Sequence, residues 1–380
     1  MLEALIDHIR AAHAVATPLV ITGGGSKAFY GNASTGEVLD TRSLSGVVDY
    51  QPKELVLTAR AGTPLGEIEA LLAEHKQMLA FEPPHFGSPL PNPPPHAGEG
   101  ANETPKAVKA TLGGCVAAGL SGPRRPYAGA VRDFVLGVRM IDGTGQALRF
   151  GGQVIKNVAG YDVSRLMTGS LGTLGLLTEV SLKVLPRPAA EVSLQFEMNE
   201  ADAILKMNQW AGQPLPLSAT SWHAGLLTVR LSGAASALHA AQIKLGGEPL
   251  HDAAAFWQRL RDQSAAFFDK CPPSSNKTLW RLAVKSSTPP LQLGDAQWIE
   301  WGGAVRWLAC PSGHKSDLPA AALREAARGC GGHATLFHGA APADGAFTPL
   351  APALLSLHRN LKQRFDPKGI FNRGRLYPEF

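Results

Sequence analysis

The stretch Ile21–Asn32, ITGGGSKAFYGN, decides how the N-terminal half of this chain is interpreted. Three consecutive glycines, Gly23 to Gly25, are followed by Ser26 and Lys27. This order matches neither a P-loop, which needs G-x-x-x-x-G-K-[ST], nor a Rossmann turn, which needs G-x-G-x-x-G. Consecutive glycines nevertheless let backbone N–H groups approach a ligand, and such groups form a concavity suited to phosphates. The loop by itself leaves two alternatives, a phosphate cradle and a plain tight turn.

A second glycine-rich segment lies at residues 110–145, ATLGGCVAAGLSGPRRPYAGAVRDFVLGVRMIDGTG. It brings Gly113, Gly114 and Gly119 together with several alanines. Small residues at this density indicate either that a flat, bulky group lies against the backbone or that two elements pack very closely. The pair Arg132 and Asp133 then precedes an apolar strand that ends at an Asp-Gly turn.

A third segment, VIKNVAGYDVSRLMTGSLGTLGLLTEVSLKVLP at 154–186, repeats glycine every three residues at Gly169, Gly172 and Gly175. A Rossmann interpretation fails because the part before these glycines, YDVSRLM, is helix-like where a strand is required. Three glycine clusters in this order are improbable as a coincidence of turns.

Around these clusters, residues 1–186 alternate short apolar runs with turns. The pattern predicts an amphipathic helix at the N-terminus and strands at 18–22, 54–61, 134–141, 147–150 and 176–185. Thr63 as N-cap and Pro64 at the first helical position predict a helix over 65–78. The stretch 87–105 has six prolines and almost no large apolar residue, which is typical of an exposed, disordered insertion.

The pattern changes after residues 185–194, LPRPAAEVSL, which have the composition of a linker. Beyond it we predict one helix over 251–268 and buried strands at 279–285, LWRLAVK, and 298–310, WIEWGGAVRWLAC. A second domain is therefore expected at 187–350, with residues 351–380 as a C-terminal segment.

Composition and charge exclude several classes of protein. The chain is 44% hydrophobic and 18% charged, which is typical of a globular protein, and no apolar run is long enough to cross a bilayer. The four cysteines form no C-x-x-C pair and the histidines no metal spacing, so we expect no metal. A basic run near the end, which includes Arg373 and Arg375, lacks interleaved aromatics, so it favours anion or partner contact over nucleic acid.

The three glycine clusters, in this order, resemble the FAD-binding (PCMH-type) domain of the vanillyl-alcohol oxidase type, in the FAD-linked oxidase family. The resemblance lies in ITGGGSK, in TLGGCVAAGLSGP with RDFVLG, and in KNVAGYDVSRLMTGSLGTLG. Within it, the chain is similar to the FAD-binding subunits of bacterial glycolate oxidases. That similarity extends over SGPRRPYAGAVRD, FWQRLRD, LWRLAVK, WIEWGGAVRW, GHATLFHG and FDPKGIFNRGRLY. It implies an α+β fold, in which a two-subdomain FAD-binding domain at 1–186, rejoined by 351–380, carries a smaller α+β cap at 187–350.

The resemblance also implies the cofactor site. FAD would be noncovalent, because Ser26 and Lys27 stand where covalently linked members often carry histidine. Asn372 would return to the flavin, although the tail reads Asn372-Arg373-Gly374 where asparagine-proline-glycine is usual. The implied cofactor-binding residues are Thr22, Gly23, Gly24, Gly25, Ser26, Lys27, Thr111, Gly113, Gly114, Gly119, Arg132, Asp133, Gly172, Gly175, Leu177 and Asn372.

Oxidation of a 2-hydroxy acid needs a cation for the carboxylate, a base for the hydroxyl proton and a flavin for the hydride. Arg124 and Arg125 are the candidate cations, and they could equally bind a flavin phosphate or a partner subunit. His338 is the candidate base, with His223 and His333 as further possibilities. A buried, hydrogen-bonded histidine is the competing and preferred interpretation of each.

The predicted function is that of the FAD subunit of a glycolate oxidase complex, which oxidises glycolate to glyoxylate. A larger homologous FAD subunit and an Fe–S subunit are the partners that the resemblance implies. The alternative is an accessory electron-transfer or structural FAD subunit without turnover of its own. We expect a cytoplasmic protein without an integral membrane segment and leave peripheral attachment through the complex open. The preferred hydroxy acid is not specified by the sequence.

Overall fold

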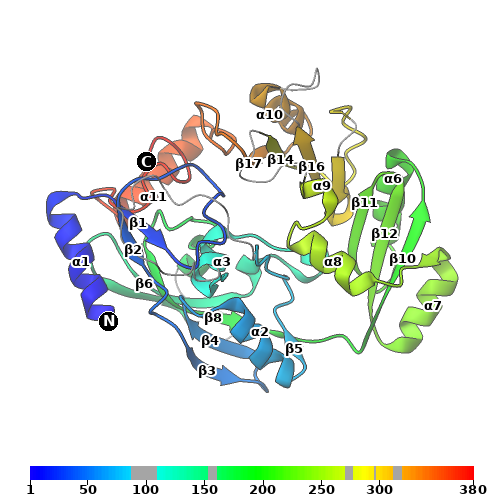
Figure 1. Ribbon diagram of the computed structural model, residues 1–380, viewed down its shortest axis with the longest axis horizontal. Helices are drawn as coiled ribbons and strands as arrows, with labels where there is room; N and C mark the ends of the chain where they lie inside the picture. The colour runs from blue at the N-terminus through cyan, green and yellow to red at the C-terminus, as the bar shows by residue number, and fades with distance from the viewer. Residues whose placement is uncertain (87–108, 153–160, 270–276, 295–296, 311–318) are drawn as a thin grey trace, which may run out of the picture.

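Two antiparallel sheets of different size organise the chain (Figure 1). They are seen in a computed structural model that describes residues 1–86, 109–152, 161–269, 277–294, 297–310 and 319–380. The predicted proline-rich insertion at 87–105 lies outside the described residues. The smaller sheet is formed by strands from the first half of the chain, and the larger sheet by strands from the second half.

The smaller sheet has the strand order β3, β4, β8, β6, β7, and these strands comprise Val47–Gln51, Val56–Arg60, Leu176–Lys183, Val135–Ile141 and Ala147–Gly151. The helices α2 (Leu65–Glu74) and α3 (Leu112–Ala118) pack with it in one hydrophobic core. Leu72 and Leu182 in this core are completely buried, and each such side chain contributes about 1.5–3 kcal/mol. The strands predicted at 54–61, 134–141, 147–150 and 176–185 are confirmed with shifted ends.

Two details of the predicted helix at 65–78 are wrong. Its N-cap is Pro64, because the Thr63 hydroxyl instead accepts a hydrogen bond from Gly46 N (2.9 Å) and donates to Arg60 O (2.7 Å). The helix ends at Glu74, since Lys76 takes a left-handed φ of 54°. Residues Gln77–Met78 then form β5, which pairs with β9 (Leu185–Pro186).

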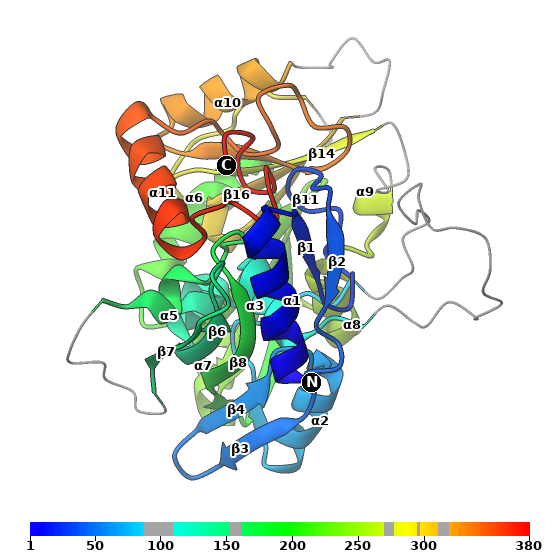
Figure 2. The same ribbon diagram turned by 90° about the vertical axis from the view of Figure 1, so that its left-hand side faces the viewer.

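The N-terminal strands and the C-terminal tail form one unit. Strand β1 (Leu19–Thr22) pairs in parallel with β2 (Glu37–Asp40), and the predicted helix α1 (Leu2–Val15) lies beside them (Figure 2). After α11 (Pro352–Phe365) the tail returns to the other edge of β1, where Leu19 N donates to Ile370 O at 2.7 Å. The tail is thereby placed next to the end of β1.

A buried ion pair fixes this tail. Lys362 Nζ lies 2.8 Å from each of three acceptors, Asp366 Oδ2, Thr173 O and Phe371 O. Asp366 in turn accepts the N–H groups of Ile370 (3.0 Å) and Phe371 (2.8 Å). These contacts satisfy both buried charges and hold the turn that leads to Asn372.

The larger sheet has eight strands. In order across the sheet they are β13 (Glu248–Pro249), β10 (Ala190–Glu197), β12 (Leu226–Gly233), β11 (Leu217–His223), β15 (Gln297–Glu300), β16 (Val305–Cys310), β14 (Thr278–Ala283) and β17 (His333–His338). Three helices pack on it, α6 (Glu200–Ala211), α7 (Ala235–Leu245) and α10 (Ala320–Gly329). Residues 190–194 belong to β10, so the prediction of a linker over 185–194 is wrong there.

Two further predictions for this half are corrected. The helix expected over 251–268 is α8 (Ala253–Arg261) and α9 (Ala266–Asp269), separated where Gln263 takes a φ of 52°. The single strand expected at 298–310 is the hairpin β15–β16, because Trp301–Gly303 form a 3₁₀ turn (η2) with Gly302 at a φ of 66°.

An aromatic cluster joins the two halves. Tyr30 and Leu120 from the first half pack in one core with Trp257, Trp307 and Phe337 from the second. The short elements α4 (Arg125–Ala128) and η1 (Val131–Asp133) follow Leu120, and α5 (Val163–Leu166) precedes the third glycine cluster. Across the part of the chain that the structure describes, the helices include none that is long and apolar enough to span a membrane.

Candidate cofactor site

The tri-glycine loop leaves β1 with a row of unpaired backbone donors. Within the described ranges, the N–H groups of Gly23, Gly24, Gly25, Ser26 and Lys27 donate to no protein acceptor. Gly25 has a left-handed φ of 76°, and a Cβ placed there would meet nothing within 4 Å. Successive N–H groups that face open space form an anion-binding concavity. The loop is therefore built as a cradle rather than as a closed turn.

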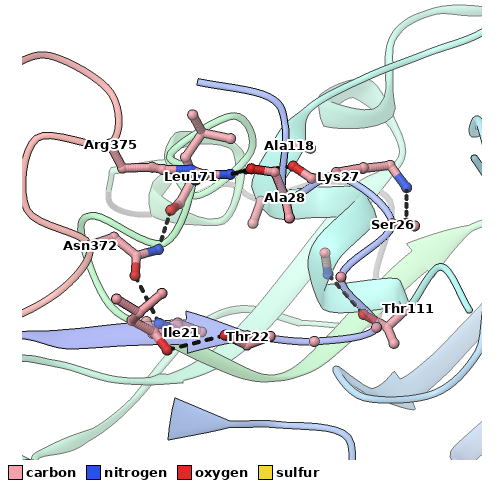
Figure 3. A pocket seen from close by; sticks show the side chains of 16 residues that line it. Ile21, Thr22, Ser26, Lys27, Ala28, Thr111, Ala118, Leu171, Asn372 and Arg375 are labelled. Atoms are coloured by element: carbon pink, nitrogen blue, oxygen red, sulfur yellow. Dashed lines mark hydrogen bonds between the residues drawn. The ribbon is translucent and has the colours of Figure 1, made fainter. Parts of the chain in front are cut away.

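Two cations, Lys27 and Arg375, lie at this cradle (Figure 3). Lys27 Nζ contacts Ser26 Oγ at 3.3 Å and lies 5.5 Å from the centre of the Phe86 ring. The Arg375 guanidinium donates to Ala28 O at 2.7 Å and to Lys27 O at 3.3 Å. Among the described residues neither side chain forms an ion pair, and burial lowers the pKa of both groups. An anion would offset this cost.

Glycines of the second cluster serve close packing between chain segments. A Cβ on Gly113 would lie 2.7 Å from Ala61 Cβ, and one on Gly119 would lie 2.9 Å from Gly169 Cα. The first donors of α3 are satisfied inside the protein, because Gly113 N donates to Ala61 O (2.7 Å) and Gly114 N to the N-cap hydroxyl of Thr111 (3.3 Å). Of the two alternatives for this cluster, closely packed elements account for Gly113 and Gly119.

Asn372 ties three segments together at the wall of the site. Its side chain accepts from Ile21 N at 2.8 Å and donates to Leu171 O at 2.6 Å, as Figure 3 shows. A Cβ on Gly172 would lie 2.7 Å from the Asn372 amide nitrogen. Asn372 is only 5% exposed and takes a φ of 41°, which asparagine tolerates better than most residues. Its amide therefore positions β1 and the third glycine segment.

Two cavities share these walls. The first, called here the cradle cavity, has about 150 Å³ of open space and is lined by predicted residues that comprise Thr22, Gly23, Gly24, Gly25, Ser26, Lys27, Thr111, Gly114 and Asn372. The second, called the inner cavity, has about 70 Å³ of open space and is lined by predicted residues that add Gly113, Gly172, Gly175 and Leu177.

Three predicted cofactor residues lie elsewhere. Gly119 packs against Gly169 and lines neither cavity. Arg132 and Asp133 are exposed, and Asp133 accepts from Ala130 N at 2.8 Å within its own turn. Asp133 therefore shapes the loop after α4 rather than the walls of the two cavities.

The structure gives Arg124, one of the two candidate cations, carboxylate partners within the protein. Its guanidinium pairs with Glu82 at 3.4 Å and with Glu191, and it donates to Ser232 Oγ at 3.2 Å. Arg124 is only 8% exposed and its guanidinium is engaged by Glu82 and Glu191, so this arrangement favours a structural role over substrate binding.

His338 and Arg125 have different surroundings. His338 ends β17, stacks on Phe29 with ring centres 4.0 Å apart, and has an Nδ1 that is buried without a partner in the described chain. Burial lowers its pKa to about 3, so it is neutral at physiological pH. Arg125, in contrast, lies over the Trp301 ring at 4.4 Å, where the two halves meet.

FAD carries a doubly charged pyrophosphate, and the residues present fit such a group. The cradle cavity offers five backbone donors and two cations, and none of the described residues that line it is aspartate or glutamate. Arg375 was not singled out for this site by sequence, although its place in the terminal basic run is a signal for anion contact. In the described part of the chain, no group of three or more His, Cys, Asp or Glu could hold a metal ion.

Comparison with known proteins agrees with this geometry. Residues 2–88 match a family model described as an FAD binding domain. The solved structure of an alkyldihydroxyacetonephosphate synthase superposes with a TM-score of 0.65 over 97% of this chain and 75% of that chain. At 16% identity this likeness concerns the fold alone. The fold is α+β and of the vanillyl-alcohol oxidase type, and the class is that of FAD-linked oxidoreductases.

Two relatives define the family more narrowly. The glycolate oxidase subunit GlcE of Escherichia coli (strain K12) is 47% identical over 99% of this chain and 97% of its own length. The glycolate oxidase subunit GlcD of Bacillus subtilis (strain 168) is 30% identical over 49% of this chain and 36% of its own. The chain belongs to the family of the glycolate oxidase subunit GlcE.

Proposed function

We propose that this chain is the FAD-carrying subunit of a glycolate oxidase complex, in which glycolate is oxidised to glyoxylate. The observation that carries the proposal is the cradle of Gly23–Lys27, where unpaired backbone donors meet Lys27 and Arg375, neither of which forms an ion pair with a described residue. The identity to GlcE over nearly the whole chain supports the choice of substrate class.

When bound, FAD supplies the acceptor for the hydride that leaves the hydroxyl-bearing carbon of the acid. Lys27, Arg375 and the loop N–H groups would bind its pyrophosphate, and Asn372 would hold the wall against which it lies. Attachment would be noncovalent, since none of the described residues that line the cradle cavity or the inner cavity is histidine, cysteine or tyrosine. Precipitation with acid should release the yellow colour into the supernatant, and colour in the pellet would contradict this.

The partners proposed for the chain are a larger homologous FAD subunit and an Fe–S subunit that takes the electrons. We also propose that 1–186 with 351–380 form the FAD-binding domain and that 187–350 form a cap. The return of the tail to β1 and the separate eight-stranded sheet support this division.

A second candidate is an accessory FAD subunit without turnover of its own. The surroundings of two predicted catalytic residues favour this candidate. Arg124 is paired with carboxylates and His338 packs against aromatic rings, so neither is placed to act on a substrate. The two candidates differ in whether the flavin of this subunit reacts with the acid.

An anaerobic visible spectrum separates these candidates. The FAD-loaded chain is recorded alone and with its partner subunits, before and after glycolate or D-lactate is added. Bleaching of the flavin band in the chain alone supports turnover in this subunit. Bleaching only in the complex supports the accessory role, and a complex whose flavin stays oxidised refutes the glycolate oxidase proposal.

A further inference from the structure

The loop that follows the cradle contains an asparagine whose hydrogen bonds reach distant parts of the chain. Asn32 is 9% exposed and lies just beyond Lys27 in the sequence. Its backbone N–H donates to Arg375 O at 2.9 Å. Its side-chain amide donates to Gly374 O at 2.9 Å and, more weakly, to Leu376 O at 3.4 Å. Asn32 therefore holds the C-terminal tail on both sides of Arg375.

The side chain of Arg375 returns these contacts to the cradle loop. Its guanidinium donates to Asn32 O at 3.2 Å, and to Ala28 O and Lys27 O at the cradle (Figure 3). A Cβ on Gly31 would lie 2.9 Å from Arg375 O, so the tail passes directly against the loop. Because these acceptors are carbonyl oxygens, they orient the guanidinium without neutralising its charge. Arg375 thus keeps a full positive charge for an anion at the cradle.

The side-chain oxygen of Asn32 binds the edge of the larger sheet. It accepts a hydrogen bond from Ala346 N at 2.7 Å. Ala346 is attached to the edge strand β17, because its own carbonyl accepts from Leu336 N at 2.8 Å. Thr348 extends this attachment, since its hydroxyl donates to Ala334 O (2.8 Å) and accepts from Ala334 N (3.1 Å). One side chain therefore joins the cradle loop, the tail and the eight-stranded sheet.

An arginine of the larger half fixes the position of Ala346. Arg324, on α10, donates to Gly345 O and to Phe347 O (3.1 Å), the carbonyls on either side of Ala346. The N–H of Ala346 is thereby presented to Asn32 by a buried support. An asparagine amide suits the junction because it carries donors for the tail and an acceptor for this N–H group. Since the junction is buried, each bond that is lost leaves a costly unsatisfied group.

We propose that Asn32 is a positioning residue for the FAD site, which holds Arg375 at the cradle and couples the cradle to the edge of the larger sheet at Ala346. This inference rests on the proposed function, since that function supplies FAD as the ligand. Arg375 lines the cradle cavity, whereas Asn32 is not one of the described residues that line it, so Asn32 acts through Arg375. Because such coupling is reciprocal, FAD on Arg375 also stabilises the contact with Ala346.

A double-mutant cycle tests whether Asn32 acts through Arg375. Flavin fluorescence gives the dissociation constant of FAD for the wild type, Asn32→Ala, Arg375→Met and the double variant. We expect Asn32→Ala to weaken binding about tenfold, because the released guanidinium loses its charge-assisted contact with the pyrophosphate. In the Arg375→Met background the same replacement should weaken binding less than about twofold, because no guanidinium is left to position.

Asn208→Ala is the matched control for a purely structural effect. Asn208, on α6, also joins separate segments through its amide, which donates to Ser286 O (3.1 Å) and Gly302 O (3.2 Å). Its loss should lower the thermal midpoint as Asn32→Ala does, yet change FAD affinity less than about twofold. Wild-type FAD affinity in Asn32→Ala, or equal weakening with and without Arg375, would overturn the proposal. A wild-type protein that binds no FAD would instead refute the proposed function.

Hydrogen exchange in the wild type gives a second result that does not depend on the folding of any variant. Exchange is followed at single amides by mass spectrometry, with and without FAD. FAD should slow exchange of the Asn32 and Ala346 N–H groups at least about fivefold, the lower end of typical coupling. The N–H of Met198, which donates to Gly225 O at 2.9 Å on the other side of the larger sheet, is the control and should not respond. Unchanged exchange at Ala346 in the FAD-loaded protein would overturn the coupling.

Discussion

Asn372 is the residue whose replacement tests the architecture of the cradle most sharply. It joins the C-terminal tail to Ile21 on β1 and to Leu171 in the third glycine segment. Replacement by alanine removes both hydrogen bonds, and replacement by aspartate removes only the donor. Because these segments form the walls of both cavities, we expect Asn372→Ala to lower stability and FAD affinity together.

The magnitude follows from three contributions. Ile21 N and Leu171 O would each lose a hydrogen-bond partner, which costs about 1 kcal/mol for each group. This value is at the lower end of the range for unsatisfied buried groups, because water in the adjoining cavity can replace part of each lost bond. Alanine at the φ of 41° would add about 1 kcal/mol, because left-handed backbone is unfavourable for it. Asn372→Ala should therefore destabilise the protein by about 3 kcal/mol and Asn372→Asp by about half as much.

FAD affinity should follow the opposite order. Aspartate places a negative charge on the wall of a cavity built for an anion, so Asn372→Asp should bind FAD more weakly than Asn372→Ala. Urea denaturation gives the stability, flavin fluorescence gives the affinity, and hydrogen exchange at Ile21 reports the lost bond directly. Gln363→Ala, at an exposed site on α11, is the control. Wild-type stability in Asn372→Ala, or equal FAD affinity in the two variants, would refute this reasoning.

Three further predictions concern other parts of the molecule. Arg124→Met should destabilise the protein by about 3 kcal/mol or more in thermal unfolding, because it leaves the Glu82 carboxylate with one cation fewer; unchanged stability would contradict this. Gly24→Val should yield little folded protein in gel filtration, since a Cβ there would lie 1.5 Å from Lys109 O; normal yield would show that the loop can move away. Glu300 has a raised pKa of about 8, so its contribution to stability is full below its unfolded value and is lost as pH rises toward about 8. In the wild type the urea midpoint should therefore fall as pH rises over that range, and in Glu300→Gln it should fall less. An equal pH dependence in the two proteins would contradict the buried carboxyl group.

Much of the cofactor site could be predicted from sequence because its features are local. Three glycine clusters in a fixed order carry the resemblance, and most of their predicted residues line one of two adjoining cavities. Strands with clear apolar patterns, such as β6 and β8, were also predictable. The burial of these strands can be inferred from the pattern of consecutive apolar residues, without knowledge of any distant contact.

The remaining features depend on contacts between distant residues. The partners of Arg124, Glu82 and Glu191, lie far from it in sequence, so nothing local distinguishes it from its neighbour Arg125. Predicting one helix over 251–268 failed for a different reason. The helix breaks where Gln263 takes a left-handed backbone conformation, and because Gln263 is not a glycine, nothing local in the sequence marks the break.

The central claim is that the Gly23–Lys27 loop, with Lys27 and Arg375, binds the pyrophosphate of FAD. The most direct measurement is the dissociation constant of FAD for the wild type, Lys27→Met and Arg375→Met, with the exposed Arg10→Met as control. Each lost cation should weaken binding about 10- to 100-fold, and high salt should narrow the difference. Wild-type affinity in both cradle variants, with the fold intact, would contradict the claim.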